Sequence, residues 1–293
     1  MPETVLGIIG GSGIYDIEGL QDARWQRVAT PWGEPSDALL TGSLEGQRLV
    51  FLPRHGRGHP ISPSGINARA NIDALKRQGV TDIVSIGAVG SLKEELPPGT
   101  FVVVDQYIDR CHDRPKSFFG DGLVAHVSLA RPTCNRMSEH VLAALGQTQI
   151  PHQRGGTYLA MEGPQFSTYA ESLLYRSWGC SVIGMTAMPE ARLAREAEIC
   201  YAAVSMVTDF DCWHDDHDDV TVDAVIKVLL ANAENARHLV GIIARRLSER
   251  PSACPAGCDH ALDHALITAP DKRDPALVAR LDAVAGRVLG NRA

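Results

Sequence analysis

The chain lacks the features that would assign it to a membrane, to secretion or to nucleic acid. Its 293 residues contain no apolar run of about 18 residues, the length that a membrane-spanning helix needs. Its first residues have neither the basic start nor the apolar core of a signal peptide. A net charge of −7 excludes a broadly basic surface for nucleic acid or anionic lipid. We expect a soluble, cytoplasmic protein that binds neither nucleic acid nor membranes.

Cysteine is too sparse and too irregular for a disulfide framework. The seven cysteines, an odd number, are scattered through apolar or mixed segments, as Cys180 and Cys200 are. This usage is typical of reduced thiols in the core of an intracellular protein.

Short β-branched runs alternate with helical patterns along the chain. We expect strands in "VLGIIG", "LVFLPR", "DIVSIGAVGS", "TFVVVDQYI", "CSVIGMT" and "EICYAAVSMVTD". Helices are expected in "NARANIDALKRQG", closed by Gly79, in "YAESLLYRSWG", closed by Gly179, and from Val222 to Leu247, where apolar residues recur at helical spacing. The alternation predicts an α/β fold: a single domain with a central mixed, largely parallel, twisted sheet flanked by helices.

A Pro-, Cys- and Gly-rich segment, "RPSACPAGCD", follows the last long helical pattern. We therefore predict a main domain at 1–248. Residues 249–293 then form a linker and a helical tail that pack on the same domain.

Polar motifs follow several predicted strands at the point where each strand ends. "GGSG" follows "VLGII", "RHGRGH" follows "LVFLP", "GAVGS" follows "DIVSI", "MTAMPE" follows "CSVIG", and "TDFD" follows "YAAVSMV". Ligands of open α/β sheets bind at the carboxyl ends of strands. Thr168 and Glu171 have capping-box spacing, which puts Ser167 just before a helix. The motifs together predict one site.

The glycine loop and the residues after "LVFLP" predict an anion site. Glycine allows φ > 0, so successive backbone N–H groups can converge on a phosphate, and Ser12 adds a hydroxyl. Asp16 stands where a dinucleotide fingerprint needs its third glycine, and the Gly-Lys pair of a Walker loop is absent. Arg54 can bind phosphate with two N–H groups, and His55 supplies a second donor. A tight turn and a solvated Arg-His pair are the alternatives.

"VTDFDCW" places two carboxylates directly after an apolar run. A carboxylate beside a purine accepts from an exocyclic amino group or, when protonated, donates to a ring nitrogen. Asp209 and Asp211 are therefore candidates for reading a base. The alternative is that they cap a helix or turn.

Two patterns have the composition of metal sites. Cys254, Cys258, His260 and His264 have a spacing that zinc can use, but we expect free thiols, an occasional disulfide and surface histidines there. "HDDHDD", at 214–219, we expect to be an acidic lid. We therefore predict that the protein holds no metal.

The motifs together resemble the methylthioadenosine phosphorylase branch of the trimeric purine nucleoside phosphorylase family. They are "GIIGGSGIYD", "TPWGEPSDALLTG", "RHGRGHPISPSGINARANI", "GSLKEELPPG", "DQYIDR", "EGPQFSTYAES", "GMTAMPEARLAREAEICYA" and "TDFDCW", in order from about Leu6 to Leu247. The resemblance implies a nucleoside phosphorylase fold, a homotrimer, and phosphorolysis of methylthioadenosine to adenine and 5-methylthioribose 1-phosphate for purine and methionine salvage. Inorganic phosphate is then a co-substrate, and no cofactor is needed.

By the same resemblance, phosphate contacts Ser12, Arg54, His55, Gly87, Ala88 and Thr186, with Met185 against the ribose and Phe166, Ser167, Asp209 and Asp211 around the base. The branch commonly carries a hydroxyl residue where this chain has Gly87, so only the backbone N–H is available there. Asp209 is our candidate general acid, because a proton donor is needed near N7 as the purine leaves. Its pKa must then be raised by apolar surroundings or by Asp211.

Substrate choice follows from a few further residues. An asparagine stands at the position of Asp209 in the 6-oxopurine branch, so Asp209 favours adenine. By the same resemblance, Val222, Val225 and Ile226 line a pocket for the 5′ substituent, where a methylthio group favours apolar walls. The alternative is that they are only core residues of an amphipathic helix. His126 resembles a residue supplied by a neighbouring subunit, or it is a structural histidine. A 6-oxopurine phosphorylase, a hydrolytic nucleosidase and a silent nucleotide-binding module remain the alternatives.

Overall fold

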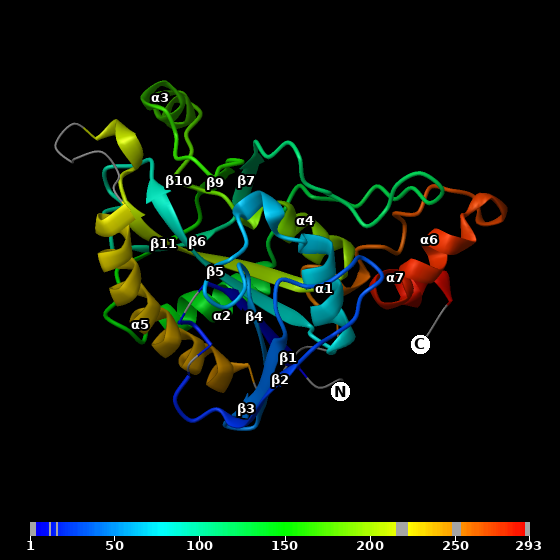
Figure 1. Cartoon of the computed structure of the whole chain (residues 1–293). Helices are drawn as coiled ribbons and strands as arrows, with labels where there is room; N and C mark the ends of the chain where they lie inside the picture. The colour runs from blue at the N-terminus through cyan, green and yellow to red at the C-terminus, as the bar shows by residue number, and fades with distance from the viewer. Residues whose placement is uncertain (1–3, 12, 16, 215–221, 248–252, 291–293) are drawn as a thin grey trace.

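The computed structural model describes residues 4–11, 13–15, 17–214, 222–247 and 253–290, with the backbone alone over 222–227. Eleven strands in this part of the chain form one mixed sheet with helices packed on both sides (Figure 1). The α/β fold predicted from the sequence is confirmed. None of the helices described is both long and apolar enough to cross a membrane.

Four parallel strands form the centre of the sheet. β1 (Val5–Gly10) pairs in parallel with β4 (Gln47–Pro53) on one side and with β5 (Asp82–Ser91) on the other. β5 also pairs in parallel with β11 (Cys200–Asp209). The carboxyl ends of all four strands therefore lie at the same edge of the sheet, and the sequence motifs that follow them are brought together there.

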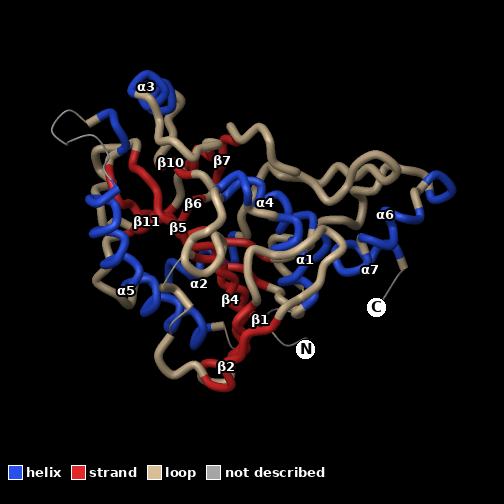
Figure 2. The backbone as a smooth tube through the Cα atoms, viewed as in Figure 1, coloured by secondary structure: helices blue, strands red, loops and turns tan. Residues whose placement is uncertain are grey.

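The remaining strands extend this centre on both sides. On one side β3 (Leu39–Leu44) pairs antiparallel with β4 and with β2 (Gln21–Gln26). On the other side lie β6 (Phe101–Val104), β7 (Gln106–Asp109), β8 (His152–Arg154), β9 (Thr157–Ala160) and β10 (Val182–Gly184). Figure 2 shows the strands as a continuous layer with the helices outside it.

Alternating residues of the central strands separate two apolar cores. On β11, Tyr201 and Ala203 join a core with α1 (Ala68–Arg77), α4 (Ala187–Glu196) and α7 (Asp282–Leu289). Ala202 and Val204 join the opposite core, with α2 (Asn135–Leu145) and α5 (Val222–Arg246). Successive side chains of a strand point to opposite faces, so a strand buried on both faces is apolar throughout.

Helix boundaries agree with the predicted signals. α3 (Tyr169–Ser177) begins with a capping box, in which Thr168 and Glu171 satisfy each other's backbone N–H groups. Gly79 and Gly179, just after α1 and α3, both have φ of +78°, a conformation that glycine adopts without steric cost. The predicted helix at 222–247 corresponds to α5.

One predicted strand, "TFVVVDQYI", is two strands in the structure. β6 pairs with β11 and β8, whereas β7 pairs with β9. The break falls at Asp105, whose N–H donates to Gly156 O at 3.2 Å while its Oδ1 accepts from Gly156 N at 3.1 Å. The carboxylate thus ties the chain to Gly156 where it passes between the two pairings, and the prediction of one continuous strand was wrong.

The C-terminal segment contains two short helices, α6 (Pro275–Arg280) and α7, of which α7 lies beside α1 (Figure 1). α7 is fixed at both ends by ion pairs. Arg77 of α1 pairs with Asp282, and Arg287 pairs with buried Glu198 at 2.5 Å. The tail thereby packs on the sheet domain.

Candidate active site

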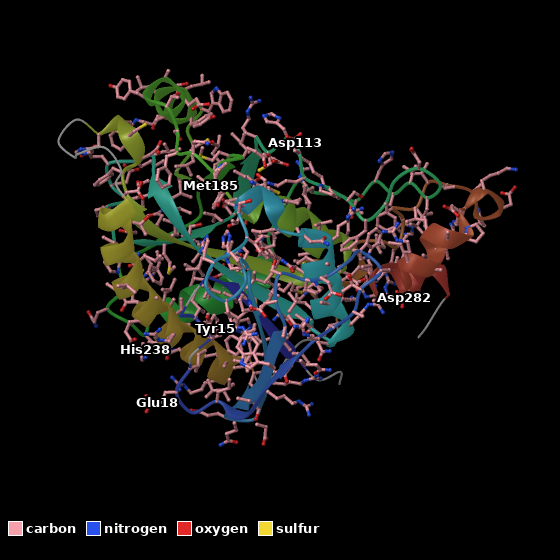
Figure 3. All side chains as sticks on the ribbon, viewed as in Figure 1. Tyr15, Glu18, Asp113, Met185, His238 and Asp282 are labelled. Atoms are coloured by element: carbon pink, nitrogen blue, oxygen red, sulfur yellow. The ribbon has the colours of Figure 1, made fainter. Side chains whose placement is uncertain are left out.

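A pocket of about 560 Å³ opens at the carboxyl edge of the central strands. It is lined by nine residues that the sequence nominated: Arg54, His55, Gly87, Ala88, Phe166, Met185, Thr186, Asp209 and Asp211. Figure 3 labels Met185 close to β10, on the same side of the molecule as α3. The structure thus gathers residues from five separate motifs around one cavity.

The other nominated residues are placed differently. Ser12 lies outside the described residues, as do the side chains of Val222, Val225 and Ile226 on α5 and most of the acidic segment at 214–219. Ser167 is adjacent to the pocket, and its carbonyl accepts from Cys212 Sγ at 3.3 Å. His126 is exposed, and its backbone N–H donates to Ala265 O at 2.9 Å. It is not among the residues that line this pocket.

Arg54 is the most deeply buried cation of the site, with 3% of its surface exposed. Its Nε donates to Glu190 Oε2 at 2.9 Å, and its Nη2 donates to Ser85 Oγ at 2.6 Å. Its Nη1 donates to Ile86 O at 2.9 Å. Burial lowers the pKa of Arg54, but the Glu190 carboxylate more than reverses this, and the guanidinium stays charged.

Glu190 was not recognised as a site residue, although it ends the motif "MTAMPE". Its Oε1 accepts from Ser85 Oγ at 2.5 Å and from Tyr201 Oη at 2.8 Å, in addition to Arg54. A buried carboxylate needs such a set of donors, because an unpaired one would lose its hydration without compensation. Its importance is visible only in three dimensions, because its partner Arg54 is 136 residues away in the sequence.

The internal partners of Arg54 change its predicted role. A guanidinium has five N–H groups, and Glu190, Ser85 and Ile86 occupy most of them. The bidentate contact with phosphate predicted from the sequence does not fit this arrangement. One Nη1 hydrogen remains, on the side of the guanidinium that lies near Gly87.

The nominated phosphate ligands converge on one corner of the pocket. A Cβ built on Gly87 would lie 3.5 Å from Arg54 Nη1 and 3.9 Å from Thr186 Oγ1. Thr186 precedes α4, and its hydroxyl makes no capping hydrogen bond to that helix. The corner therefore offers a guanidinium N–H and the Thr186 hydroxyl around a residue without a side chain, a combination suited to a small anion.

The glycine loop is held in place by two contacts. Arg54 N donates to Gly10 O at 2.9 Å, and Arg237 Nη1 donates to Gly13 O at 2.7 Å. Gly13 has φ of +93°, in the region that favours glycine. Gly11 lines the pocket between these two anchored residues.

His55 is a neutral imidazole at the edge of this corner. Burial lowers its pKa to about 4, and the nearby Arg54 charge acts in the same direction, against the Ile61 carbonyl. Its Nδ1 lies 2.9 Å from Ile61 O, and a carbonyl only accepts, so the proton is on Nδ1. Nε2 is then a hydrogen-bond acceptor, instead of the donor predicted from the sequence.

Asp209 ends β11 on the opposite side of the pocket. Its Oδ2 accepts from Thr208 Oγ1 at 2.7 Å, and its Oδ1 accepts from Asp211 N at 2.8 Å. Burial raises the pKa of Asp209 against these two hydrogen bonds. A carboxyl with a raised pKa is suited to general acid chemistry, and the predicted direction of the shift is confirmed.

Asp211 is more enclosed and differently satisfied. Its Oδ2 accepts from Ser172 Oγ of α3 at 2.5 Å, and its φ of +54° is unusual for a non-glycine residue. Burial raises its pKa, as does the charge of Asp209. The two carboxyl groups therefore have different partners, and Asp209 is the less constrained of them.

Apolar side chains line much of the rest of the pocket and form its apolar wall. Several of its residues were not nominated from the sequence: Ile14, Ile86, Val89, Met161, Ile183, Met206, Leu229 and Ala233. Leu229 and Ala233 belong to the periodic apolar set of α5, which was detected. Their place in the pocket depends on how the helix packs on the sheet, and the helical period does not encode that packing.

The geometry is that of a site for a small anion and a flat, mainly apolar ligand with one polar edge. A profile of the Phosphorylase superfamily matches residues 5–245. The chain belongs to the phosphorylase superfamily.

Two bacterial relatives are similar to this chain over nearly its whole length. The S-methyl-5′-thioadenosine phosphorylase of Rhodospirillum rubrum is 62% identical over 288 residues, 98% of each chain. That of Cereibacter sphaeroides is 63% identical over 287 residues, covering 98% of this chain and 99% of its own.

Solved structures of proteins with the same name are also similar to this chain. A methylthioadenosine phosphorylase from an antarctic soil metagenomic library superposes with a TM-score of 0.90 at 44% identity, covering 97% of this chain and 99% of its own. The methylthioadenosine phosphorylase of Schistosoma mansoni, in complex with adenine, has a TM-score of 0.78 at 34% identity, with coverages of 85% and 93%.

Proposed function

We propose that the enzyme catalyses the phosphorolysis of S-methyl-5′-thioadenosine by inorganic phosphate, giving adenine and 5-methylthioribose 1-phosphate. The observation that carries the proposal is the opposition of two groups across one apolar pocket. Arg54, Gly87 and Thr186 form an anion corner, and the carboxyl of Asp209 has a raised pKa. The two relatives described above are both named S-methyl-5′-thioadenosine phosphorylase, which states the same nucleoside as their substrate.

The anion corner binds the nucleophile. Arg54 Nη1, the Thr186 hydroxyl and backbone N–H groups of the glycine loop and of Gly87 donate to phosphate, while His55 Nε2 accepts its P–OH proton. Phosphate is a co-substrate, so the reaction requires no cofactor. Holding phosphate and nucleoside together replaces an encounter between two molecules by a step within one complex.

The reaction moves one electron pair toward the base. A phosphate oxygen forms the new bond to C1′ as the C1′–N9 bond breaks, and positive charge grows on the sugar while negative charge grows on the purine. The phosphate anion stabilises the sugar. Asp209 gives its proton to N7, so neutral adenine leaves. The Thr208 and Asp211 contacts orient the Asp209 carboxyl for this transfer.

The apolar wall selects the 5′ substituent. Ile14, Met206, Leu229 and Ala233 line the pocket with hydrocarbon and a thioether. A methylthio group gains from leaving water for such a surface, whereas the 5′-hydroxyl of adenosine loses hydrogen bonds there. Burying a hydroxyl without a hydrogen-bond partner costs about 1–3 kcal/mol of binding free energy. We therefore expect methylthioadenosine to be preferred over adenosine.

We further propose a cytoplasmic homotrimer that serves purine and methionine salvage. Its seven cysteines, all within the described residues, form no disulfide, which suits a reducing compartment. Tyr169, Leu173, Leu174 and Trp178 expose large apolar side chains on or beside α3, which favours burial against another subunit. In such a ring His126, which is exposed, reaches a neighbour's pocket. Sedimentation of the purified protein tests the assembly, and a fully active monomer would exclude it.

The decisive experiment offers methylthioadenosine, adenosine, inosine and methylthioinosine to the enzyme, each with and without phosphate, and identifies the base released. We expect adenine from methylthioadenosine, only with phosphate, together with an equal amount of the sugar 1-phosphate. Release of base without phosphate would identify a nucleosidase instead, and a preference for inosine would identify a 6-oxopurine phosphorylase.

A matched pair of variants connects that activity to the pocket. Asp209→Asn removes the proton donor and should abolish most turnover, whereas Asp271→Asn changes an exposed carboxylate of the tail and should leave turnover intact. Equal activity of both variants would remove Asp209 from the mechanism.

A further inference from the structure

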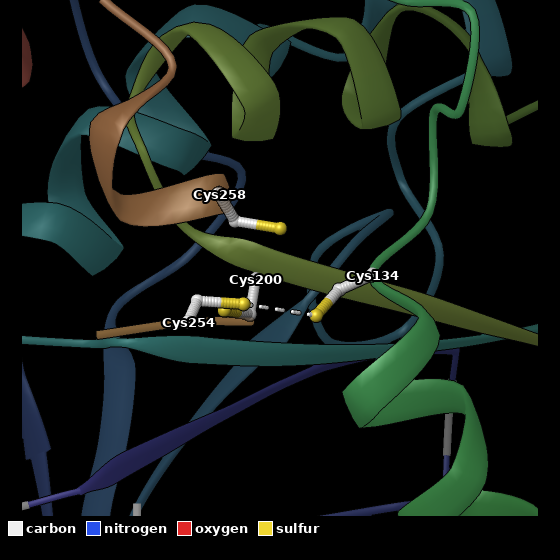
Figure 4. Close-up of side chains that lie close together, drawn as sticks. All are labelled: Cys134, Cys200, Cys254 and Cys258. Atoms are coloured by element: carbon white, nitrogen blue, oxygen red, sulfur yellow. Dashed lines mark hydrogen bonds between the residues drawn. The ribbon is translucent and has the colours of Figure 1, made fainter. Parts of the chain in front are cut away.

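Four cysteines lie together on the side of the sheet that faces α2 and α5, at the end of β11 opposite the pocket. The Sγ atoms of Cys134, Cys200, Cys254 and Cys258 all lie within 4.8 Å of one another (Figure 4). All four side chains are buried, with exposed fractions of 5% or less. The mechanism proposed above uses none of them.

The four thiols come from distant parts of the chain. Cys134 immediately precedes α2, and Cys200 is the first residue of β11. Cys254 and Cys258 flank a turn of the C-terminal segment, in which Gly257 N donates to Cys254 O at 2.8 Å and Gly257 has φ of +68°. The turn directs both of its thiols toward the other two (Figure 4).

Their spacing matches tetrahedral thiolate coordination. Zn²⁺ binds Cys sulfur at about 2.3 Å, so the sulfur atoms of a tetrahedral site are about 3.8 Å apart. Cys134 Sγ and Cys254 Sγ are 3.6 Å apart, and the remaining pairs lie within the 4.8 Å limit. The separation of every sulfur pair is therefore at most about 1 Å longer than in a tetrahedral site.

Two arginines beside the cluster offset part of the charge of such a site. One Zn²⁺ with four thiolates carries a net charge of −2. Arg195 Nη1 donates to Cys258 Sγ at 3.4 Å. Arg136, two residues after Cys134, is the second cation, and its guanidinium also pairs with the buried carboxylate of Asp82.

Two further features favour thiolates over thiols here. The buried Nε and Nη1 of Arg136 have no hydrogen-bond partner among the described residues, so they remain available as donors to a thiolate. Cys134 lies at the N-terminal end of α2, where the helix dipole stabilises a negative charge.

We propose that Cys134, Cys200, Cys254 and Cys258 bind one structural Zn²⁺ ion. Binding deprotonates the thiols, so up to four protons are released for each ion. All four positions around the metal are occupied by protein, which defines a structural rather than a catalytic site. This differs from the expectation drawn from the sequence, in which no metal was predicted and His260 and His264 accompanied Cys254 and Cys258. Those two histidines are exposed and lie outside the cluster.

The ion would anchor the C-terminal segment to the sheet. Beyond Cys258 the segment returns along the loop that carries His126, where Ala125 and Leu266 form a β-bridge and Thr268 Oγ1 accepts from Val124 N at 2.8 Å. The zinc site thus fixes one end of the segment that supports this loop. Its loss would loosen the tail and leave the pocket residues in place.

The first test measures metal in the protein as purified. The full chain is prepared under reducing conditions in chelator-treated buffer, and zinc is determined by elemental mass spectrometry. We expect about one zinc per chain. Denaturation with a thiol-blocking mercurial and a colorimetric zinc indicator should release the same amount. Metal-free protein in which all four thiols react after denaturation, or in which mass spectrometry finds them in disulfides, would overturn the proposal.

The second test identifies the ligands. Protein expressed with Co²⁺ in place of Zn²⁺ should show the ligand-field and thiolate-to-cobalt absorption of a tetrahedral sulfur site. Cys254→Ser and Cys258→Ser should lose this absorption and their zinc, whereas the matched control Cys180→Ser, a buried cysteine outside the cluster, should keep both. Equal zinc in all three variants would place any metal elsewhere. The first test uses only the wild-type protein. The proposal can therefore be refuted even if the cysteine variants fail to fold.

Discussion

The two ends of β11 carry buried polar groups that are satisfied in opposite ways. At its beginning, Cys200 is fully buried among three other cysteines, beside the guanidiniums of Arg136 and Arg195. At its end, Asp209 borders an open cavity of about 560 Å³, with only two hydrogen bonds from its neighbours. One end is enclosed by the chain itself, and the other retains capacity for a ligand.

The difference follows from the direction of the strands. The carboxyl ends of parallel strands meet loops that diverge and leave a crevice, whereas the C-terminal segment covers the other end of the sheet. Polar residues at the open end keep unused hydrogen-bonding capacity, which a ligand in the pocket can fill. At the closed end they must satisfy one another, or hold an ion that does so. Burial alone therefore does not identify a catalytic group.

The largest expected effect separates the two ends directly. Asp209→Asn removes the proton donor, and general acid catalysis contributes about 100-fold to 10,000-fold in rate, so kcat for methylthioadenosine should fall in that range. Cys200→Ser should lower the midpoint of thermal unfolding and leave kcat nearly unchanged. Steady-state kinetics and calorimetry of both variants provide the measurement. If Cys200→Ser folds but has a much lower kcat, the two ends of β11 do not have separate roles in stability and catalysis.

Asp209→Asn also tests base reading. An amide can accept from N1–H of a 6-oxopurine and cannot deliver a proton, so the ratio of kcat/KM for methylthioinosine to that for methylthioadenosine should rise roughly tenfold to hundredfold. An unchanged ratio at saturating phosphate would assign the base contact to Asp211.

Arg54→Ala should affect both binding and folding. Glu190 loses its cationic partner inside the protein, and breaking a buried ion pair costs about 3–5 kcal/mol. The KM for phosphate should rise far more than the KM for nucleoside, because the anion corner loses its guanidinium. Urea unfolding and initial rates measure the two effects.

The double variant Arg54→Met with Glu190→Gln separates them. It removes both charges, so it should recover most of the stability and none of the phosphate affinity. A normal KM for phosphate in the double variant would remove Arg54 from the site.

The raised pKa of Asp209 predicts a pH-dependent stability. Its folded-state pKa lies above the unfolded value of about 3.9, so its contribution to the free energy of unfolding is complete below about pH 4. That contribution is lost as the pH rises through the raised pKa. Asp209→Asn should flatten this part of the stability curve between acidic and neutral pH. Chemical unfolding at fixed ionic strength measures it, and parallel curves for both proteins would contradict a raised pKa.

The smallest expected effect concerns Gly87. A Cβ there meets only ordinary contacts, the nearest 3.5 Å away at Arg54 Nη1. Gly87→Thr adds a hydroxyl to the anion corner and should lower the KM for phosphate about 2-fold to 10-fold, the value of one hydrogen bond. Gly90→Thr is the contrasting control, because its Cβ would lie 2.9 Å from Asp209 Oδ1 and should disable the enzyme. Similar behaviour of the two variants would show that the corner is not where phosphate binds.

The open end of β11 was largely predictable from sequence, and the closed end was not. β1, β5 and β11 are long apolar runs that end in glycine or carboxylate motifs, and both signals are local. Strands β2 and β8, with the sequences "QDARWQ" and "HQR", are polar and exposed along their length. They have no local signal, and their pairing with neighbours defines them.

Long-range pairing explains the remaining misses. Cys254 and Cys258 are close in sequence and suggested nearby histidines as partners, whereas the fold supplies Cys134 and Cys200. In the same way Glu190 became visible only as the partner of Arg54. Spacing along a helix or turn is encoded locally. The side chain that meets another across a sheet depends on strand order and register, which no single motif contains.

The pairing of Arg54 with Glu190 also limits how such a chain can diverge. A substitution at either position alone leaves an unpaired charge inside the protein. Such a protein loses a large share of its free energy of unfolding, which is typically about 5–15 kcal/mol for a domain. A lineage that exchanges one residue must therefore acquire the other almost at once, or first gain stability elsewhere. We expect the two positions to be inherited together among descendants of this chain, while Gly87, where a Cβ meets only ordinary contacts, can change to another small residue in a single step.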